Sequence, residues 1–346
     1  MVQEKNSHVP AWFRETKKYE KPSLARALWQ ILNTVIPLAM LWVAMIWLTK
    51  TGQPYFITAL LIIPSGFLMI RLFIFFHDCT HGSFFASRSA NRVVGTLLGI
   101  LTFTPFLDWQ KAHGIHHATT SNLDKRGVGD IWTLTLEEYK QAKPSKRFWY
   151  KIYRNPIFLF LIVPPLLFYV LQRFPSRRVD KKIRKNMLIT NLGILLMVAS
   201  LGIFGGWNLV LTIELPMFYV SSIVGVWLFY VQHQFDPGYW EHNEDWSFHN
   251  AAMLGSSHYK LPKWLQWFSG NIGFHHIHHL RPHIPNYNLE RCYRATPELQ
   301  LPNPLTFLTS LSSLTLHIWD EKRKVLLGFR EAGKLLRSLS AKQVLA

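Results

Sequence analysis

Four long apolar runs constrain this chain more than any other feature of its sequence. They cover residues 31–48, 55–76, 187–204 and 209–231. At a rise of about 1.5 Å per residue, each run is long enough as a helix to cross a hydrocarbon core of roughly 30 Å. Since 49% of the 346 residues are apolar and only 17% are charged, a soluble globular enzyme is largely excluded. The sequence therefore predicts an all-α integral membrane protein with about four full transmembrane helices.

Short connections join these runs into two helical hairpins. Residues 49–54 and 205–208 have the Gly, Pro and Asn content of compact turns. Two further apolar runs, 93–107 and 157–170, are too short to cross comfortably alone. We expect them to be interfacial or re-entrant segments with both ends on one side of the membrane, and a tight double-pass hairpin is the alternative.

The distribution of Lys and Arg predicts the orientation of the chain. Of 38 such residues, 36 lie in segments that the expected hairpins place on one face; the others are Lys50, in a turn, and Arg71, whose side chain we expect to extend to the interface. Basic segments stay on the cytosolic side, so the net charge of +18 needs no nucleic acid as a partner. Both termini are then cytosolic.

We expect one domain over residues 1–346, with a cytosolic N-terminal segment (1–30), a membrane region with cytosolic loops (31–231) and a cytosolic helical cap (232–346). Residues 305–346 have amphipathic helical spacing, and the charged run 320–324 would be their solvated face. The two cysteines cannot form a multi-disulfide framework, and no Cys-x-x-Cys pair is present.

Histidine clusters provide the strongest chemical signal. Eight of the 16 histidines fall in three clusters, which are His77 and His81; His113, His116 and His117; and His275, His278 and His279. Positions i, i+3 and i+4 share one helix face, so each cluster can point its imidazoles at one place. The predicted topology brings all three to the cytosolic membrane surface. Eight imidazoles exceed the three or four protein ligands of a usual catalytic metal site, which favours two metals.

Other residues are candidates for supporting roles. His233, at the end of the fourth run, is a ninth candidate ligand. Ligating imidazoles need their second nitrogen held, and Asp78, Glu241 and Asp245 are candidate carboxylates for this role; the acidic pair in the cap could equally be solvated loop charges. Four aromatic residues near the clusters could line or close a substrate channel, or could belong to an interfacial aromatic belt: Trp109, Trp132, Tyr239 and Trp246. Imidazole suits Zn, Cu, Fe and Ni, so the ligand type leaves the metal open.

The motifs around these histidines resemble those of a known family. Residues 77–85 (HDCTHGSFF), 113–117 (HGIHH) and 275–287 (HHIHHLRPHIPNY) are similar to the three histidine boxes of membrane-bound acyl-lipid fatty acid desaturases. The intervening segments 121–130, 230–233 and 260–262 are most similar to bacterial members that make a delta-5 double bond in membrane phospholipids. Thr80 departs from the Gly often found there, which affects local packing more than chemistry.

The resemblance implies a cofactor, a reaction and partners. Two iron ions would use O2 as co-substrate, together with two electrons, to remove two hydrogens from adjacent methylenes of a phospholipid acyl chain, leaving a cis double bond and water. No Cys cluster or soluble stretch suggests a built-in redox module, so we expect a separate electron donor, a ferredoxin or flavodoxin. The location would be a bacterial cell membrane, with the active site on the cytosolic side.

Alternative functions remain open at this stage. Di-iron membrane hydroxylases and ketolases acting on lipids share the same kind of site. A membrane heme electron carrier or a metal transporter would place its histidines within the bilayer on facing spans, whereas these cluster on one predicted surface. Spacing does not reveal which carbon pair reacts, or the preferred headgroup and chain length.

Overall fold

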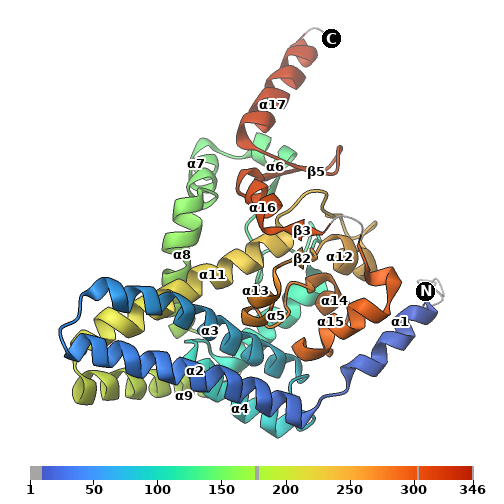
Figure 1. Cartoon of the computed structure of the whole chain (residues 1–346). Coiled ribbons are helices and arrows are strands. Elements are labelled where there is room, and N and C mark those ends of the chain that lie inside the picture. Colours follow the sequence, from blue (N-terminus) through green and yellow to red (C-terminus); the bar gives the residue numbers. More distant parts are fainter. Residues whose placement is uncertain (1–9, 176–178, 302–303, 345–346) are drawn as a thin grey trace.

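The computed structural model describes residues 10–175, 179–301 and 304–344, and the chain is mostly helical (Figure 1). Four helical segments of the described chain are long and apolar enough to cross a membrane, as predicted. They are α2 (Leu24–Lys50), α3 (Tyr55–His81), the segment Lys181–Gly205, and the segment Trp207–His233. The third contains α9 (Lys181–Ser200) and η5 (Leu201–Gly205); the fourth contains α10 (Trp207–Leu209), η6 (Val210–Glu214) and α11 (Leu215–His233).

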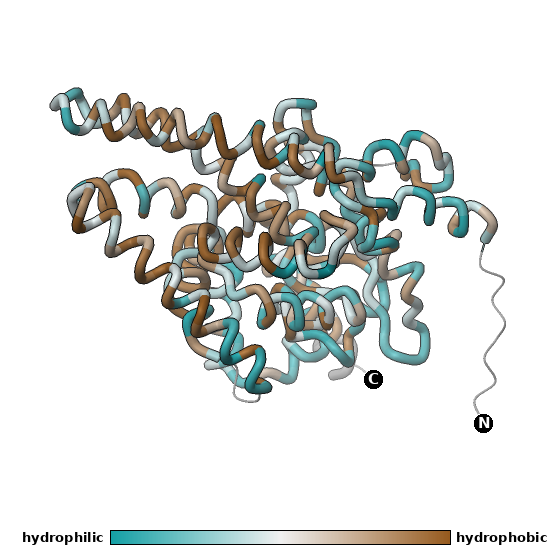
Figure 2. Tube along the Cα trace, turned by 90° about the horizontal axis from the view of Figure 1, so that it is seen from below, coloured by the Kyte–Doolittle hydropathy of each residue, from teal (hydrophilic) through white to brown (hydrophobic). Residues whose placement is uncertain are grey.

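Tight turns close both hairpins, as their composition predicts. Gly52 follows α2 with φ of +70°, and Gly206 separates η5 from α10 with φ of +105°. Residues with a Cβ rarely adopt these dihedral angles, so glycine permits the abrupt reversals. Hydrophobic residues dominate the long helices on the upper left of Figure 2, and hydrophilic residues are more frequent on its right.

Helix α3 lies at the centre of the membrane region. It packs against α2, α4 and α11. Of its most apolar 18-residue stretch, 61% is buried, compared with 11% of the corresponding stretch of α2. The sequence of α3 is apolar on all sides, which suits a helix surrounded by other helices. Its last turns therefore have a well-defined position, and they carry His77 and His81.

Arg71 of α3 does not extend to the interface, which corrects our expectation. Its side chain is buried, its Nε donates to the Thr34 hydroxyl at 3.0 Å, and its guanidinium lies 4.1 Å from the centre of the Trp267 ring. It also donates to the Trp267 carbonyl. Because these groups satisfy the guanidinium internally, Arg71 connects α2, α3 and α13 (Lys263–Phe268).

The two shorter apolar runs belong to bent helix pairs. Helices α4 (Arg88–Leu101) and α5 (Phe106–Thr119) meet at 100°. Helix α7 (Pro144–Tyr153) and the helical segment Phe158–Arg173 meet at 65°. That segment consists of η2 (Phe158–Ile162), α8 (Val163–Pro165), η3 (Leu166–Val170) and η4 (Leu171–Arg173). Bends of this size suit re-entrant or interfacial segments, and the bend after α4 turns α5 toward the end of α3.

The predicted all-α class is confirmed for the chain as a whole, and two small sheets that the sequence did not indicate accompany the helices. In the first sheet, β4 (Ile318–Asp320) pairs in parallel with β1 (Leu134–Thr135) and antiparallel with β5 (Val325–Leu327). In the second, β2 (Tyr259–Lys260) pairs in parallel with β3 (Leu305–Thr306). Residues far apart in the chain supply these pairs, so local periodicity does not reveal them.

Residues 305–344 accordingly differ from the amphipathic helix that we expected. Only α17 (Phe329–Val344) is a long helix there, and it projects away from the rest of the chain (Figure 1). The short α16 (Phe307–Ser310) and η8 (Leu311–Thr315) precede β4. The charged run 320–324 forms the turn between β4 and β5, where the buried Asp320 carboxylate accepts backbone hydrogen bonds from Lys322 and Arg323.

The remaining elements are short. Before α2 lie α1 (Ala11–Glu15) and η1 (Thr16–Glu20), and α6 (Leu136–Gln141) follows β1. After α11 come α12 (Phe248–Leu254), α14 (His275–Leu280), α15 (Asn286–Ala295) and η7 (Pro297–Leu299). The division into an N-terminal segment, a membrane region and a cap stays a prediction, and residues 1–9 of that segment lie outside the described residues.

Candidate metal centre

Four helices bring the nine predicted histidines together. His77 and His81 lie one turn apart at the end of α3, and His233 is the last residue of α11. Helix α5 carries His113, His116 and His117, and the short α14 carries His275, His278 and His279. The i, i+3 and i+4 spacing turns the members of each cluster to one side of their helix, as we expected.

The nine imidazoles form two groups. In each group, every residue offers one ring nitrogen that lies within 4.8 Å of the corresponding nitrogens of the others. The five-histidine group consists of His77, His81, His113, His117 and His278. The four-histidine group consists of His116, His233, His275 and His279. Two groups agree with the expectation of two metal ions.

Distances between the ring nitrogens fit metal ligation. In the five-histidine group, the Nε2 atoms of His77 and His117 each lie 3.0 Å from Nε2 of His113. In the four-histidine group, Nε2 of His233 lies 3.1 Å from that of His116 and 2.9 Å from that of His275. A metal bound about 2.0–2.1 Å from each imidazole separates neighbouring ligand nitrogens by about 3 Å when the bonds are near right angles.

Hydrogen bonds alone do not satisfy these nitrogens. A neutral imidazole has one N–H, yet Nε2 of His113 and Nε2 of His233 each face two other ring nitrogens. In addition, Nε2 of His81 is buried and has no hydrogen-bond partner. A cation at the centre of each group would bind the converging lone pairs, so the residues fit a metal.

The environment of α14 keeps its imidazoles neutral. His275, His278 and His279 are buried, and burial lowers the pKa of each of them well below the ordinary value of 6.5, with the neighbouring imidazoles acting in the same direction. Metal ligation requires the unprotonated ring, so these side chains need lose no proton before they bind an ion. By contrast, His276 points away and its Nε2 donates to the Leu299 carbonyl at 2.9 Å, so it belongs to neither group.

One carboxylate at the centre was missed by sequence reasoning. Oδ1 of Asp130 lies 2.7 Å from Nδ1 of His116 and accepts the proton of that nitrogen. This contact leaves Nε2 of His116 as the free ring nitrogen, directed toward the four-histidine group. Asp130 follows α5 on a loop, where spacing along a helix gives no signal. A search for carboxylates in the whole loop that follows α5 would have included it.

The structure places the three predicted carboxylates in different surroundings. Oδ1 of Asp78 lies 3.3 Å from Nδ1 of His77, and its Oδ2 accepts hydrogen bonds from the backbone and side-chain amides of Asn286, at 2.7 and 2.9 Å. Glu241 forms an ion pair with Lys324, and the side chain of Asp245 is exposed. Within the described parts of the chain, neither of these two bonds to any of the nine imidazoles.

Trp109 is the one predicted channel residue whose ring contacts the grouped histidines of the described chain. Its ring stacks on His113 with centroids 4.2 Å apart. Trp132 instead contacts Tyr150 and Tyr153. The Tyr239 hydroxyl donates to the Asp245 carbonyl, and the Trp246 indole donates to the Thr120 carbonyl. Phe229, which we did not predict, lies 5.4 Å from His116 and 5.1 Å from His233, measured between ring centroids.

A family comparison identifies the class of enzyme. The family model described as fatty acid desaturase matches residues 53–309, which include all nine histidines. The chain belongs to the fatty acid desaturase family. This confirms the predicted resemblance and makes the protein a membrane fatty acid desaturase, an oxidoreductase, rather than a heme carrier or a metal transporter.

Individual desaturases agree with this assignment. The chain is 44% identical over 317 residues to a fatty acid desaturase of Bacillus subtilis. The matched region covers 92% of this chain and 90% of that protein. It is 26% identical to an sn-1 oleoyl-lipid 12-desaturase of Synechocystis, over 71% of this chain and 70% of the relative. An sn-1 acyl-lipid omega-3 desaturase (ferredoxin) of Synechocystis is 29% identical, over 67% of this chain and 65% of the relative.

Proposed function

We propose that this desaturase is an O2-dependent enzyme with two iron ions, one held by each group of histidines. The observation that carries the proposal is the convergence of nine imidazoles into two groups on four helices. Removing hydrogen from unactivated methylenes requires a redox-active metal, which favours iron over zinc, because zinc has no redox chemistry. When bound, the iron pair would supply the oxidising power by activating O2.

The chain's own residues would prepare this chemistry. The five-histidine group would hold one ion and the four-histidine group the other, while Asp130 and Asp78 fix the orientation of His116 and His77. Trp109 and Phe229 place aromatic surface against the histidines, which helps to exclude water and to receive an alkyl chain. The balanced reaction converts CH2–CH2, O2, two electrons and two protons into CH=CH and two water molecules.

We further propose that the substrate is an acyl chain of a membrane phospholipid. Two relatives are named as desaturases of sn-1 acyl lipids, and the chain itself has four candidate spans that would hold it among lipids. Its similarity to bacterial members in the intervening motifs supports a cis bond at the delta-5 position. We assign the enzyme to a bacterial cell membrane, with its termini and metal centre in the cytosol.

The test combines lipid analysis with metal analysis. We expect a host expressing the wild-type chain to accumulate unsaturated phospholipid acyl chains, and the purified protein to contain about two iron ions. His81→Ala and His279→Ala, one in each group, should each lower product by at least about a hundredfold and reduce bound iron. His249→Ala is the matched control, because this exposed imidazole belongs to neither group.

Two outcomes would contradict the proposal. Purified protein with one zinc and no iron would exclude the di-iron centre. Hydroxylated acyl chains in place of unsaturated ones would show that the centre performs the related hydroxylation. Both results are readable from the same cultures, by elemental analysis and by mass spectrometry of the lipids.

The electron donor is proposed to be a separate acidic carrier, a ferredoxin or flavodoxin. One relative's name includes ferredoxin, and four exposed basic residues gather at the start of α9, namely Lys181, Lys182, Arg184 and Lys185. Opposite charges speed association, and salt screens them over about 8 Å at physiological ionic strength. With limiting carrier, turnover should therefore fall as salt rises. Salt-independent turnover would assign this basic patch to lipid contact alone.

A further inference from the structure

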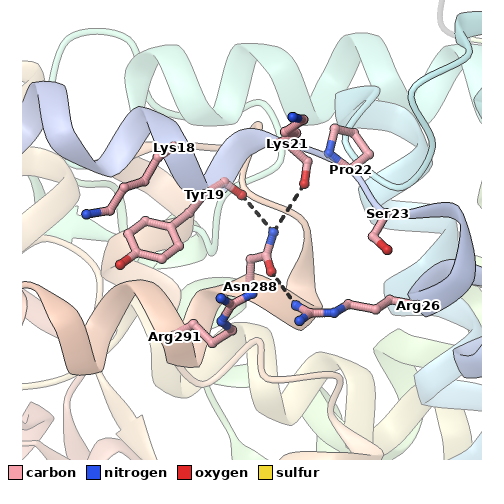
Figure 3. A pocket seen from close by; sticks show the side chains of 8 residues that line it. All are labelled: Lys18, Tyr19, Lys21, Pro22, Ser23, Arg26, Asn288 and Arg291. Carbon is pink, nitrogen blue, oxygen red and sulfur yellow. Dashed lines mark hydrogen bonds between the residues drawn. The ribbon is translucent and has the colours of Figure 1, made fainter.

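A cavity of about 520 Å³ lies between the N-terminal segment and α15, and none of the nine grouped imidazoles lines it. Its size falls within the range of roughly 300–1,000 Å³ that is typical of small-ligand sites. Four basic side chains surround it, which are Lys18, Lys21, Arg26 and Arg291 (Figure 3). We refer to it as the basic pocket.

Among the described residues, no carboxylate neutralises the basic pocket. Within the residues that the structure describes, its four cations form no ion pair with an acidic side chain. The nearest acidic residues in the sequence are paired elsewhere. Glu20 accepts a hydrogen bond from Arg281 at 2.8 Å, and Glu290 pairs with Lys263 and Arg294. The surplus positive charge therefore suits an anionic ligand.

A buried amide holds the pocket in shape. Asn288 is only 6% exposed, and its Oδ1 accepts a hydrogen bond from Nη1 of Arg26 at 2.9 Å. Its Nδ2 donates to the Tyr19 carbonyl at 2.9 Å. Figure 3 shows Asn288 between the carbonyls of Tyr19 and Lys21 on one side and the guanidinium of Arg26 on the other. Because this guanidinium has a fixed position, less conformational entropy is lost when it binds a ligand.

The pocket lies where a predicted membrane span begins. Arg26 is in the first turn of α2, whose most apolar window makes it a candidate span. Leu28 and Trp29 lie two and three residues after Arg26 and are 47% and 65% exposed, so they would face lipid. Tryptophan is enriched at the boundary between bilayer and water. The pocket would therefore open at the depth of the lipid phosphates.

Helix α15 links the basic pocket to the metal centre. Asn286 begins this helix, and both its backbone and side-chain amides donate to Asp78, which lies beside His77. Asn288 stands two residues further along the same helix. A ligand held in the pocket would thus have a defined position relative to the nine histidines.

We propose that the basic pocket binds the phosphate of a glycerophospholipid headgroup, and that this lipid is the substrate whose acyl chain is desaturated. The second part rests on the proposed function. Arginine and lysine form charge-assisted hydrogen bonds with phosphate oxygens, and Arg26 and Arg291 can each contribute a planar guanidinium. The pocket would hold the lipid by its headgroup while the acyl chain extends toward the metal centre.

Binding experiments with the purified full-length protein test the site. We expect dihexanoyl phosphatidylglycerol to bind the wild type better than dihexanoyl glycerol, which lacks the phosphate. R26Q/R291Q should weaken phosphatidylglycerol binding about tenfold or more and leave dihexanoyl glycerol binding unchanged. K18Q/K21Q should also weaken phosphatidylglycerol binding. Because it spares the bond between Arg26 and Asn288, it tests the pocket even where the arginine variant fails to fold. K17Q and R294Q remove nearby charges outside the pocket and should bind like the wild type.

Kinetic measurements distinguish a failure of the proposed phosphate site from a failure of the proposed function. With long-chain phosphatidylglycerol in nanodiscs, R26Q/R291Q should raise KM about tenfold with little change in kcat, while diacylglycerol turnover stays unchanged. Variants that weaken the binding of both lipids equally would contradict the proposed phosphate site. Inorganic phosphate that binds as tightly as the phospholipid would also contradict it. A wild type that binds phospholipid at the pocket but desaturates no lipid would contradict the proposed function instead.

Discussion

At the scale of single residues, the contact between Asp130 and His116 is the clearest support for the candidate metal centre. The carboxylate accepts the Nδ1 proton at 2.7 Å, so it sets the tautomer of a ring whose Nε2 faces the four-histidine group. Partners of this kind usually change metal affinity or activity by about 10–100-fold. We therefore expect Asp130→Asn to lower activity by about that factor and to reduce bound iron, as measured by elemental analysis alongside product formation.

Asp245→Asn is the matched control for this substitution. Asp245 is exposed and bonds to none of the nine imidazoles of the described chain, so its loss should change neither activity nor metal content. Full iron occupancy and activity in Asp130→Asn would show that His116 keeps its orientation without the carboxylate.

The residues of the candidate centre could be predicted only where helical spacing brings them together. His113 and His117 are four positions apart, so their common face follows from the sequence. Asp130 and Phe229 reach the same histidines through a loop and through the packing of α11, and neither depends on local periodicity. Sequence reasoning therefore identified the candidate ligands and missed part of their surroundings.

At the scale of elements, the packing of α4 against α5 positions three candidate ligands. A Cβ at Gly95 would lie 2.2 Å from Cε2 of Phe106 and 3.0 Å from Cβ of Cys79. Gly95→Ala must therefore displace the start of α5, at a cost of about 1–3 kcal/mol in stability. We expect a lower midpoint of thermal unfolding in nanodiscs, together with a lower metal content.

Gly114→Ala is the control on the same helix. A Cβ at Gly114 meets nothing within 4 Å, and replacing glycine by alanine within a helix stabilises it by about 0.5–1 kcal/mol. The unfolding midpoint should therefore rise slightly while metal content stays constant. Equal stability of the two variants would show that α4 and the start of α5 can move apart without loss of stability.

A cluster of exposed charges connects three distant segments and predicts a dependence of stability on pH. His242 lies between Glu321 and Asp124, at 3.0 and 2.7 Å. Hydrogen bonds to Glu321 and then to Asp124 raise the pKa of His242 above 6.5. Hydrogen bonds from the Asn243 backbone and then from His242 lower the pKa of Asp124 below 3.8.

The signs of these two shifts define the pH window. Because the pKa of His242 is raised in the folded state, the contacts of the protonated ring with Glu321 and Asp124 stabilise the fold fully below pH 6.5. This contribution disappears as the pH rises through the raised pKa. The lowered pKa of Asp124 stabilises above pH 3.8, and its contribution is lost as the pH falls through the lowered value. The unfolding midpoint of the wild type should exceed that of His242→Gln between about pH 4 and 6, and the difference should vanish near pH 9. A difference that does not vary with pH would exclude this linkage.

Helices and turns could be predicted where neighbouring residues in the sequence determine them. The spans follow from apolar length, and the turns around Gly52 and Gly206 follow from composition. Leu134 pairs with Ile318 in the first sheet, and no local pattern indicates a partner so far along the chain. The burial of Arg71 depends likewise on Trp267, which lies in a separate part of the fold.

At the scale of the whole molecule, the orientation in the membrane is directly testable. The charge distribution predicts that both hairpin turns lie outside the cell and that the candidate metal centre lies inside. Gln53→Cys and Asn208→Cys should react with an impermeant maleimide in intact cells. Lys125→Cys should react only after permeabilisation. These exposed positions avoid the positive φ of Gly52 and Gly206 and the burial of Ser121.

The chain itself offers a clean background for this experiment. Cys79 and Cys292 are both buried, so the parent protein should label weakly. Labelling of Lys125→Cys in intact cells would reverse the proposed orientation, and it would also place the candidate site for the electron donor on the wrong side of the membrane.

The arrangement of the two histidine groups has a consequence for how the protein is made. The five-histidine group draws on α3, α5 and α14, and the four-histidine group draws on α5, α11 and α14. Translation proceeds from the N-terminus, so α3 and α5 are synthesised long before α14 exists. A nascent chain that ends before His275 contains neither group in full. Any metal that needs a complete group would then be bound late in biogenesis, only after the spans are in place and α14 has folded back against them.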